Sequence, residues 1–168
     1  MFGINNSSAI FSEKQKFDQW WIWLIFIGTN SILLFGAYQQ LILGESFGDK
    51  PMSDTGLILS LILSLGITLL FVMLSLETVI TKQSISFNFK PFSRNNILLK
   101  NIDSVKLVNY GFVGSGIRMG TKYGTIYKIK GQTGLAIVLK NGKKYCIGTQ
   151  KEDEMLAALK QIVPILKS

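Results

Sequence analysis

The stretch Trp20–Leu43, WWIWLIFIGTNSILLFGAYQQLIL, decides the fold class together with Gly56–Leu76, GLILSLILSLGITLLFVMLSL. Neither stretch contains Asp, Glu, Lys or Arg. At about 1.5 Å per residue, a helix of either length spans the roughly 30 Å hydrocarbon core of a bilayer. Backbone groups in lipid must be hydrogen-bonded within their own segment, which favours helices. The sequence therefore predicts a transmembrane hairpin, with helices at 20–43 and 56–76 and an external loop at 44–55.

A cleaved signal peptide is the alternative interpretation of the first apolar stretch. Nineteen mostly polar residues precede it, and no small-residue cleavage site follows it. Three tryptophans, Trp20, Trp21 and Trp23, cluster at one end, where amphipathic rings favour the membrane interface. The stretch is therefore predicted to be an anchor that is retained.

The basic residues predict the orientation of the hairpin. Residues 77–168 carry fifteen Lys and Arg against five acids, whereas the connector 44–55 has one Lys against three acids. Segment 1–19 is balanced, with Lys14 and Lys16 close to the first helix. Because Lys and Arg near membrane helices favour the cytoplasmic side, we expect a multi-pass protein of the cell (inner) membrane with both termini cytoplasmic.

The second helix carries small residues at a strict spacing of four. Such a stripe lets another helix approach closely, and Gly28 and Gly36 of the first helix could face it. The partner is either the first helix of the same chain, which we favour, or a second copy in a homo-oligomer. The stripe consists of Gly56, Ser60, Ser64 and Thr68.

Composition argues against catalysis and metal chemistry. The chain has no His, so an imidazole base or metal ligand is excluded. The single cysteine, Cys146, cannot complete a zinc site or an internal disulfide, and it is expected to be a small buried apolar residue. The sequence predicts a non-enzymatic protein without metal or cofactor.

The segment 77–168 is predicted to be a cytoplasmic domain rich in strands. Alternation of apolar and polar residues indicates strands, glycine-rich stretches indicate turns, and Asn141-Gly142 predicts a type I′ hairpin turn. Lys90-Pro91 is expected to interrupt the ladder. The expected strands are 78–81, 85–89, 97–100, 104–109, 125–130, 135–140 and 143–147, and residues 110–123 are expected to form a loop or a distorted strand pair.

A C-terminal helix should follow the strands. Thr149 and Glu152 fit a capping box, and Pro164 predicts an end or bend near that residue. An apolar stripe would cover an open sheet; its members are Met155, Leu159, Ile162 and Leu166. The predicted fold is therefore a two-helix transmembrane hairpin followed by a mainly-β α+β domain of about seven antiparallel strands and one amphipathic helix.

The stretch Leu76–Ile162 resembles the bacterial pleckstrin-homology-like (PH-like) domains of small membrane proteins of unassigned function. The resemblance rests on four short motifs. They are Leu76-Glu77-Thr78 after a membrane helix, Gly114-x-Gly116-Ile117-Arg118 after Tyr110, Gly134-Leu135 in a hairpin, and Ile147-Gly148-Thr149-Gln150 before the final helix. It implies a PH-like fold.

The candidate binding residues lie in the glycine-rich segment and the hairpins beside it. The run Gly114-Ser115-Gly116-Ile117-Arg118 lacks the phosphate-loop spacing and is favoured as a glycine-rich bulge. Arg118 is a planar donor for phosphate or carboxylate, or else pairs with Asp103 or a backbone carbonyl. Exposed lysines near anionic headgroups would attract lipid, but lysines also keep sheet edges soluble, and both readings stay open. The lysines that flank the two central hairpins are Lys122, Lys128, Lys130, Lys140, Lys143 and Lys144, and the first three are selected as candidate binding residues.

Two functional hypotheses follow from these patterns. In the leading one, a membrane-anchored, non-catalytic module presents a PH-like domain to a cytoplasmic protein or to anionic lipid of the inner leaflet. In the alternative, the chain is a small accessory subunit that acts through its transmembrane helices in a larger assembly. No nucleic-acid-binding motif is found, so nucleic acid is not an expected partner.

Overall fold

The fold is described from a computed structural model, which describes residues 9–111 and 114–166, with side chains up to residue 162. The chain divides into two compact units. The helical hairpin is Phe17–Met73, and the β domain comprises the described parts of Met1–Lys16 and Leu74–Ser168.

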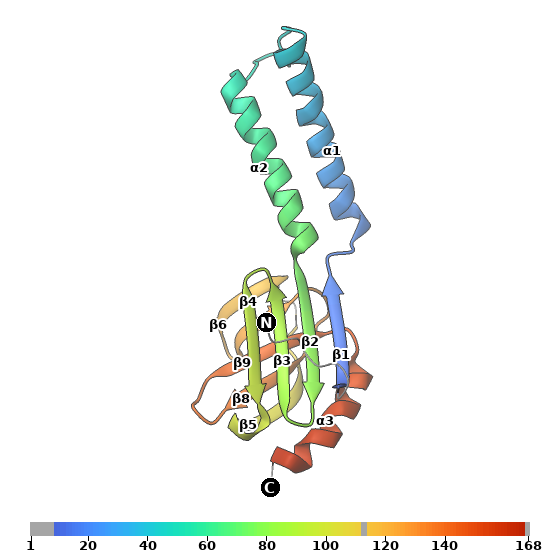
Figure 1. Ribbon diagram of the computed structural model, residues 1–168, viewed down its shortest axis with the longest axis vertical. Coiled ribbons are helices and arrows are strands. Elements are labelled where there is room, and N and C mark those ends of the chain that lie inside the picture. The colour runs from blue at the N-terminus through green and yellow to red at the C-terminus, as the bar shows by residue number, and fades with distance from the viewer. Residues whose placement is uncertain (1–8, 112–113, 167–168) are drawn as a thin grey trace. The chain divides into compact units, whose positions relative to one another are not determined.

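The helical hairpin contains two apolar helices, α1 (Trp20–Ala37), extended by the π-helix η2 (Tyr38–Ile42), and α2 (Asp54–Met73) (Figure 1). Both are long and apolar enough to cross a membrane. The helix α2 begins two residues before the predicted start because Ser53 Oγ accepts a hydrogen bond from Gly56 N at 3.2 Å and Asp54 complements the positive end of the helix.

The same helix also ends earlier than predicted, at Met73 rather than residue 76. Ser75 already pairs with strand neighbours, and Leu76 is fully buried in the β domain. The apolar run thus continues from a helix into a core strand, and hydropathy does not mark the change between them.

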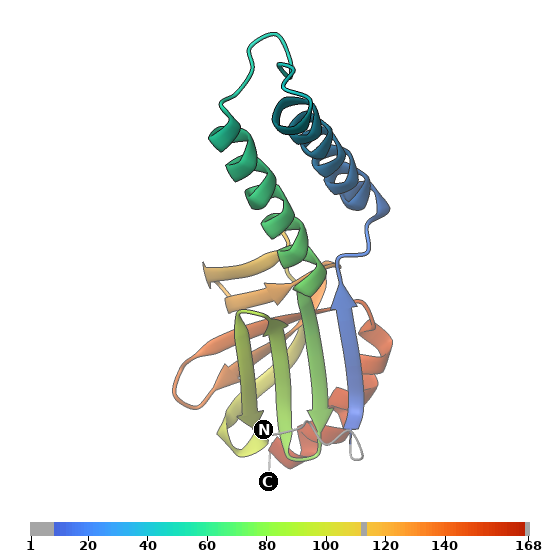
Figure 2. The ribbon, with the colours of Figure 1, turned by 45° about the horizontal axis from the view of Figure 1, so that its top comes forward.

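The β domain holds nine strands in two sheets, a short 3-10 helix and a C-terminal helix. Figures 1 and 2 show the strands of one sheet crossing behind those of the other. The first sheet has the order β1-β2-β3-β4, formed by β1 (Ala9–Lys16), β2 (Ser75–Thr81), β3 (Ser84–Lys90) and β4 (Ser93–Leu98). The second has the order β5-β8-β9-β7-β6, formed by β5 (Ile102–Asn109), β6 (Gly116–Thr121), β7 (Gly124–Lys128), β8 (Thr133–Leu139) and β9 (Lys144–Thr149).

Aromatic rings join the two sheets. The ring of Phe87 lies 5.0 Å from that of Tyr127 and 5.7 Å from that of Tyr145, measured between centroids. The ring of Phe89 lies 6.3 Å from that of Tyr127. These inward-facing side chains alternate with polar residues along β3, as the sequence pattern predicted.

The helix α3 (Glu152–Leu166) packs against β1, β5 and the 3-10 helix η3 (Leu99–Asn101). Its residues Met155, Leu159 and Ile162 are buried, as expected, whereas the predicted role of the Leu166 side chain lies outside the described residues. The helix continues two residues beyond Pro164. The general α+β layout is thus confirmed, with two apolar helices near the N-terminus followed by most of the strands and a final helix, although strand β1 precedes the helices.

Four details of the strand prediction were wrong. The described residues hold nine strands rather than about seven, and β7 runs parallel to β9. The predicted strand 97–100 is replaced by the end of β4 followed by η3. The Asn141-Gly142 turn is not type I′, because Gly142 alone has a positive φ and its N donates to Leu139 O at 2.9 Å. These features indicate a type I turn followed by a glycine bulge.

The remaining difference is strand β1, which the sequence analysis placed in a separate N-terminal segment. It pairs antiparallel with β2 from Lys16 opposite Ser75 to Ala9 opposite Thr81. The chain therefore starts one sheet of the β domain, passes through the helical hairpin and returns to the neighbouring strand.

Candidate functional site

The predicted Gly114–Arg118 segment leads into β6, which begins at Gly116, and is held by local contacts. Ser115 Oγ donates to Ile129 O at 2.7 Å, and Gly116 lies opposite Lys128 with a φ of 113°. The guanidinium of Arg118 rests on Gly114, where a Cβ atom would collide with it. The structure therefore brings Gly114 and Arg118 together, and it accounts for both glycines through backbone geometry and close approach. Residues 112–113 of this loop lie outside the described residues.

The three predicted lysines do not form one exposed patch. The side chain of Lys128 is 94% buried, with Nζ 5.4 Å from the centroid of the Tyr110 ring, and burial lowers its pKa. Lys122 is exposed and lies over the ring of Tyr123 at 4.9 Å. Lys130 is half-buried, and its backbone N donates to Gln15 Oε1 at 3.4 Å. Of the three, only Lys122 presents a fully exposed charge.

Sequence reasoning missed the environment of Tyr110. Its ring covers a glycine pair, Gly134 opposite Gly148, where a Cβ on either residue would meet it at 2.8 Å. Burial raises the pKa of the phenol, and the hydroxyl has no hydrogen-bond partner among the described residues. The two glycines make room for an aromatic ring on the sheet, which gives the Gly134 and Gly148 motifs a packing role.

A second missed feature is a buried polar cluster centred on β1. The carboxylate of Glu13 accepts hydrogen bonds from Thr149 Oγ1 at 2.6 Å, from Gln150 N at 2.8 Å and from Gln15 Nε2 at 3.1 Å. Gln15 Nε2 also donates to Gly148 O at 2.8 Å. The predicted capping box is replaced, because Thr149 Oγ1 accepts from Lys151 N and donates to Glu13. Glu13 thus supplies the carboxylate beside the start of α3.

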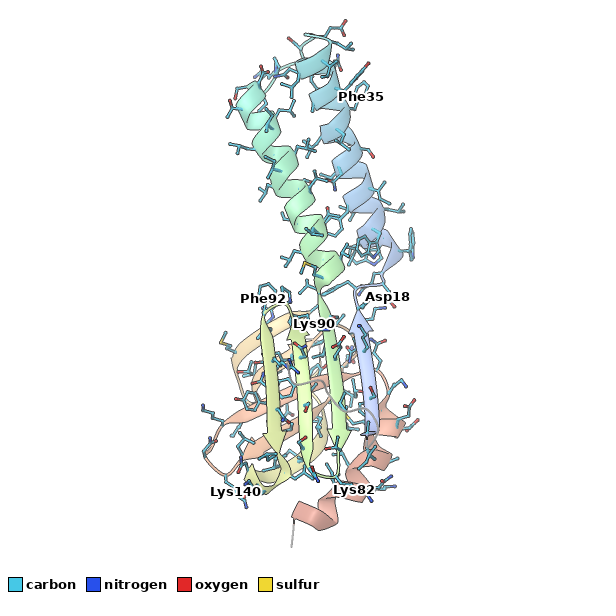
Figure 3. All side chains as sticks on the ribbon, in the orientation of Figure 1. Asp18, Phe35, Lys82, Lys90, Phe92 and Lys140 are labelled. Carbon is cyan, nitrogen blue, oxygen red and sulfur yellow. The ribbon has the colours of Figure 1, made fainter. Side chains whose placement is uncertain are left out.

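Basic and aromatic residues gather where the β domain joins the hairpin in sequence. Lys16, Ser75 and Lys90 lie side by side on β1, β2 and β3. Glu77 forms ion pairs with Lys14 at 2.7 Å and with Lys90 at 2.9 Å. Phe92, in the following turn, is 61% exposed, and Figure 3 shows it beside Lys90 at this end of the sheet. We call Lys14, Lys16, Lys90 and Phe92 the connection end.

A groove lies at the other end of the β domain. It runs between β4, η3 and the β8–β9 hairpin, and its volume is about 430 Å³. Lys140, which lines it, lies at the same end as Lys82 and opposite Lys90 and Phe92 (Figure 3). We call this the asparagine groove, because its polar lining is Asn95, Asn96, Asn101, Asn141, Lys140 and Lys143.

In the hairpin, the small-residue stripe follows the less exposed face of α2. Gly56, Ser60, Ser64 and Thr68 are all half-buried among mainly exposed neighbours, and Asn30 Nδ2 of α1 donates to Thr68 Oγ1 at 2.9 Å. This supports packing within the chain.

The two glycines of α1 behave differently from the prediction. Gly28 is exposed with nothing near its Cβ position, whereas Gly36 packs against the ring of Phe47 in the connecting loop. Neither is therefore the partner of the stripe on α2.

Cys146 is fully buried, as predicted, and burial raises the pKa of its thiol to about 12. It therefore stays protonated and packs as an apolar side chain.

Comparison with known proteins gives no matching family model and no matching curated protein.

Proposed function

We propose that the chain is a membrane-anchored, non-catalytic binding module, with α1 and α2 crossing the inner membrane and both termini in the cytoplasm. The β domain, as a PH-like module, engages anionic lipid of the inner leaflet through its connection end. The observation that carries this proposal is that the chain leaves and re-enters the β domain at directly paired residues, Lys16 and Ser75.

Both connections between the β domain and the hairpin are short. The helix α2 ends at Met73 and β2 begins at Ser75, and β1 ends at Lys16 only four residues before α1 begins. Both connections therefore leave the β domain at the connection end, which presents Lys14, Lys16, Lys90 and Phe92.

Charge and aromatic character support lipid as the ligand. Each Lys near an anionic surface is worth on the order of 1 kcal/mol, and an exposed ring beside it suits the interfacial region. The half-exposed side chains of Lys14 and Lys90 also bind Glu77, which fixes their positions on the sheet. The alternative, an accessory subunit acting through its helices, has less support because the small-residue stripe packs against α1.

The orientation is tested by labelling single cysteines in intact cells. Ser46→Cys lies in the connector and Gln83→Cys in the turn after β2, both at exposed positions. An impermeant maleimide should label Ser46→Cys from outside, and Gln83→Cys only after permeabilisation. Labelling in the reverse order would overturn the topology.

The lipid contact is tested with a chain in which residues 17–74 are replaced by an Asn-Gly turn between Lys16 and Ser75. It should pellet with vesicles containing phosphatidylglycerol but not with phosphatidylcholine alone. The variant K16Q/K90Q/F92A should weaken partitioning by about 2 kcal/mol or more, roughly thirtyfold, because two charges are lost.

The matched control is K106Q/K160Q/L156A, which removes two exposed lysines and one exposed apolar side chain elsewhere in the β domain. It should retain most of the binding. Equal losses of vesicle binding in both variants would show that binding depends on net charge alone. Absence of vesicle binding by the unsubstituted domain would refute lipid as the ligand.

A further inference from the structure

The asparagine groove combines a concave shape with an unusual polar lining. Four of the nine asparagines in the chain lie in it, together with two lysines. Three separate segments supply them: β4, η3 and the turn between β8 and β9. A volume of about 430 Å³ lies within the range of small-molecule sites. Solubility alone would require exposed lysines but not this convergence of amides.

Hydrogen bonds within the protein fix which amide atoms remain for a ligand. Asn96 Oδ1 accepts from Ser86 Oγ at 2.9 Å, and Asn141 Oδ1 accepts from Lys143 N at 3.1 Å. Asn141 therefore retains its Nδ2 group as a donor, whereas the amide of Asn96 lies on the outer face of β4 beside Ser86. With the ammonium groups of Lys140 and Lys143, the groove has three donor groups, and none of its nine described lining residues is acidic.

The backbone holds these donors in place before any ligand arrives. Lys140 N donates to Asn101 O at 3.0 Å, which ties the hairpin to η3. Within the hairpin, Leu139 N donates to Lys143 O at 2.9 Å. A site whose walls are already joined loses less conformational entropy on binding than a mobile loop does.

One side of the groove suits an organic group. Ile97, Leu139 and Tyr145 contribute apolar surface, and the Tyr145 ring is fixed by its contact with Phe87 in the core. Asn95 Nδ2 donates to Ser93 Oγ at 2.8 Å, so the Oδ1 atom of Asn95 is left as an acceptor for a ligand hydroxyl. The lining therefore matches an anionic group joined to a small hydroxyl-bearing one.

We propose that the asparagine groove binds a phosphate monoester of a small polar organic group that is free in the cytoplasm, because the groove lies at the end of the β domain opposite the connection end (Figure 3). Phosphate oxygens accept from the two lysines and from the amide of Asn141, while the organic part lies along Tyr145 and meets Asn95. Charge-assisted bonds of this kind are about twice as strong as neutral ones. This site is separate from the connection end, and the proposal does not rest on lipid binding there.

The test uses the full chain in phosphatidylcholine nanodiscs, titrated with sn-glycerol 3-phosphate by calorimetry. Saturable binding is expected. The variant K140Q/K143Q should weaken it at least about tenfold, because two charge-assisted bonds are lost. Asn141→Asp should weaken it at least as much, because an acidic acceptor replaces a donor while the bond from Lys143 N is kept, and Asn141→Ala gives the same test without a new charge. The charge-matched control K106Q/K160Q should stay within about twofold, since distant exposed charges are screened.

Phosphatidic acid in the nanodisc carries the same monoester on a lipid, so it tests whether a bilayer headgroup reaches the groove. Undisturbed binding of sn-glycerol 3-phosphate is expected. Competition in the wild type, but not in K140Q/K143Q, would overturn the free ester as the occupant. No saturable binding up to about 10 mM, well above a millimolar Kd, would overturn the proposal. So would an equal loss in the K106Q/K160Q control. Variants of the connection end should leave this titration unchanged, so the two proposals fail separately.

Discussion

The helical hairpin and the β domain place their apolar side chains in opposite directions. In the hairpin most of the large apolar residues of α1 and α2 are exposed, whereas in the β domain most large apolar residues are buried, with Phe92 and Met119 among the exceptions. Polar side chains show the opposite distribution. Asn30 and Thr68 are hydrogen-bonded to each other between the helices of the hairpin, whereas lysines lie on the surface of the β domain. One chain thus carries two surface patterns, as expected if its halves meet different solvents.

The two regions also differ in how they depend on chain segments distant in sequence. The hairpin is continuous from Phe17 to Met73, but the β domain is assembled from both sides of it. Strand β1 brings Phe11, Glu13 and Gln15 into the interior of the β domain. The β domain should therefore survive loss of the hairpin and fail without β1.

Deleting residues 1–16 should have the largest effect. Strand β2 would become an unpaired edge, and Thr149, Gln150 and Gly148 would lose their buried partners. Circular dichroism and amide proton dispersion should show an unfolded or aggregated domain. The matched control is the chain with 17–74 replaced by Asn-Gly, which should be folded; if it is equally disordered, the β domain depends on its hairpin.

Replacing Glu13 with Ala should destabilise the β domain by about 3 kcal/mol or more, because each unsatisfied buried group costs about 1–3 kcal/mol. Three donors lose their acceptor at once. Urea unfolding of the Asn-Gly-linked domain measures the change. Ser12→Ala, on the exposed face of the same strand, should stay within about 0.5 kcal/mol, and an equal loss there would show a general sensitivity of β1.

Strand β1 also shows why part of the fold escaped sequence reasoning. Its inward positions after Phe11 are Glu13 and Gln15, so polar residues occupy both faces and the alternation that marks a half-buried strand is absent. These side chains face backbone and hydroxyl groups around Thr149 rather than an apolar surface. Strand β3, with Ile85, Phe87 and Phe89 inward, was predicted to within a residue.

The candidate sites were harder to predict than the strands. The glycine-rich segment has a visible motif, and the structure gives it local packing roles. The asparagine groove has no motif, because Asn96, Asn101 and Asn141 are ordinary turn and edge residues until the sheets bring them together. The positive charge of Lys128 made it a candidate for a surface binding site. The alternation of apolar and polar residues around it did not reveal that the Tyr110 ring lies against its side chain.

Within the hairpin, Asn30→Val should have a moderate effect. It removes the hydrogen bond to Thr68, and such bonds between membrane helices are worth about 0.6 kcal/mol on average and at most about 1.7 kcal/mol. Reversible unfolding in bilayer-like micelles, with Thr68→Val and the double variant, gives the coupling energy. Thr29→Val, at an exposed position, is the control. A coupling energy of zero would mean that this hydrogen bond does not stabilise the hairpin and that the two helices associate through close packing alone.

The smallest expected effect is a pH dependence at the connection end. Partial burial raises the pKa of Glu77, but hydrogen bonds and charges from Lys14 and Lys90 outweigh burial, so the pKa lies below its ordinary value of 4.5. A lowered folded-state pKa adds stability that is present above the unfolded value and is lost as the pH falls through the folded one. Because the lysines are about half exposed, the contribution should stay below about 1 kcal/mol. Comparing the Asn-Gly-linked domain with its Glu77→Gln variant from pH 6 down to about pH 3 should show the difference shrinking on acidification. A difference that grows instead would mean that burial of the carboxylate outweighs its two lysines.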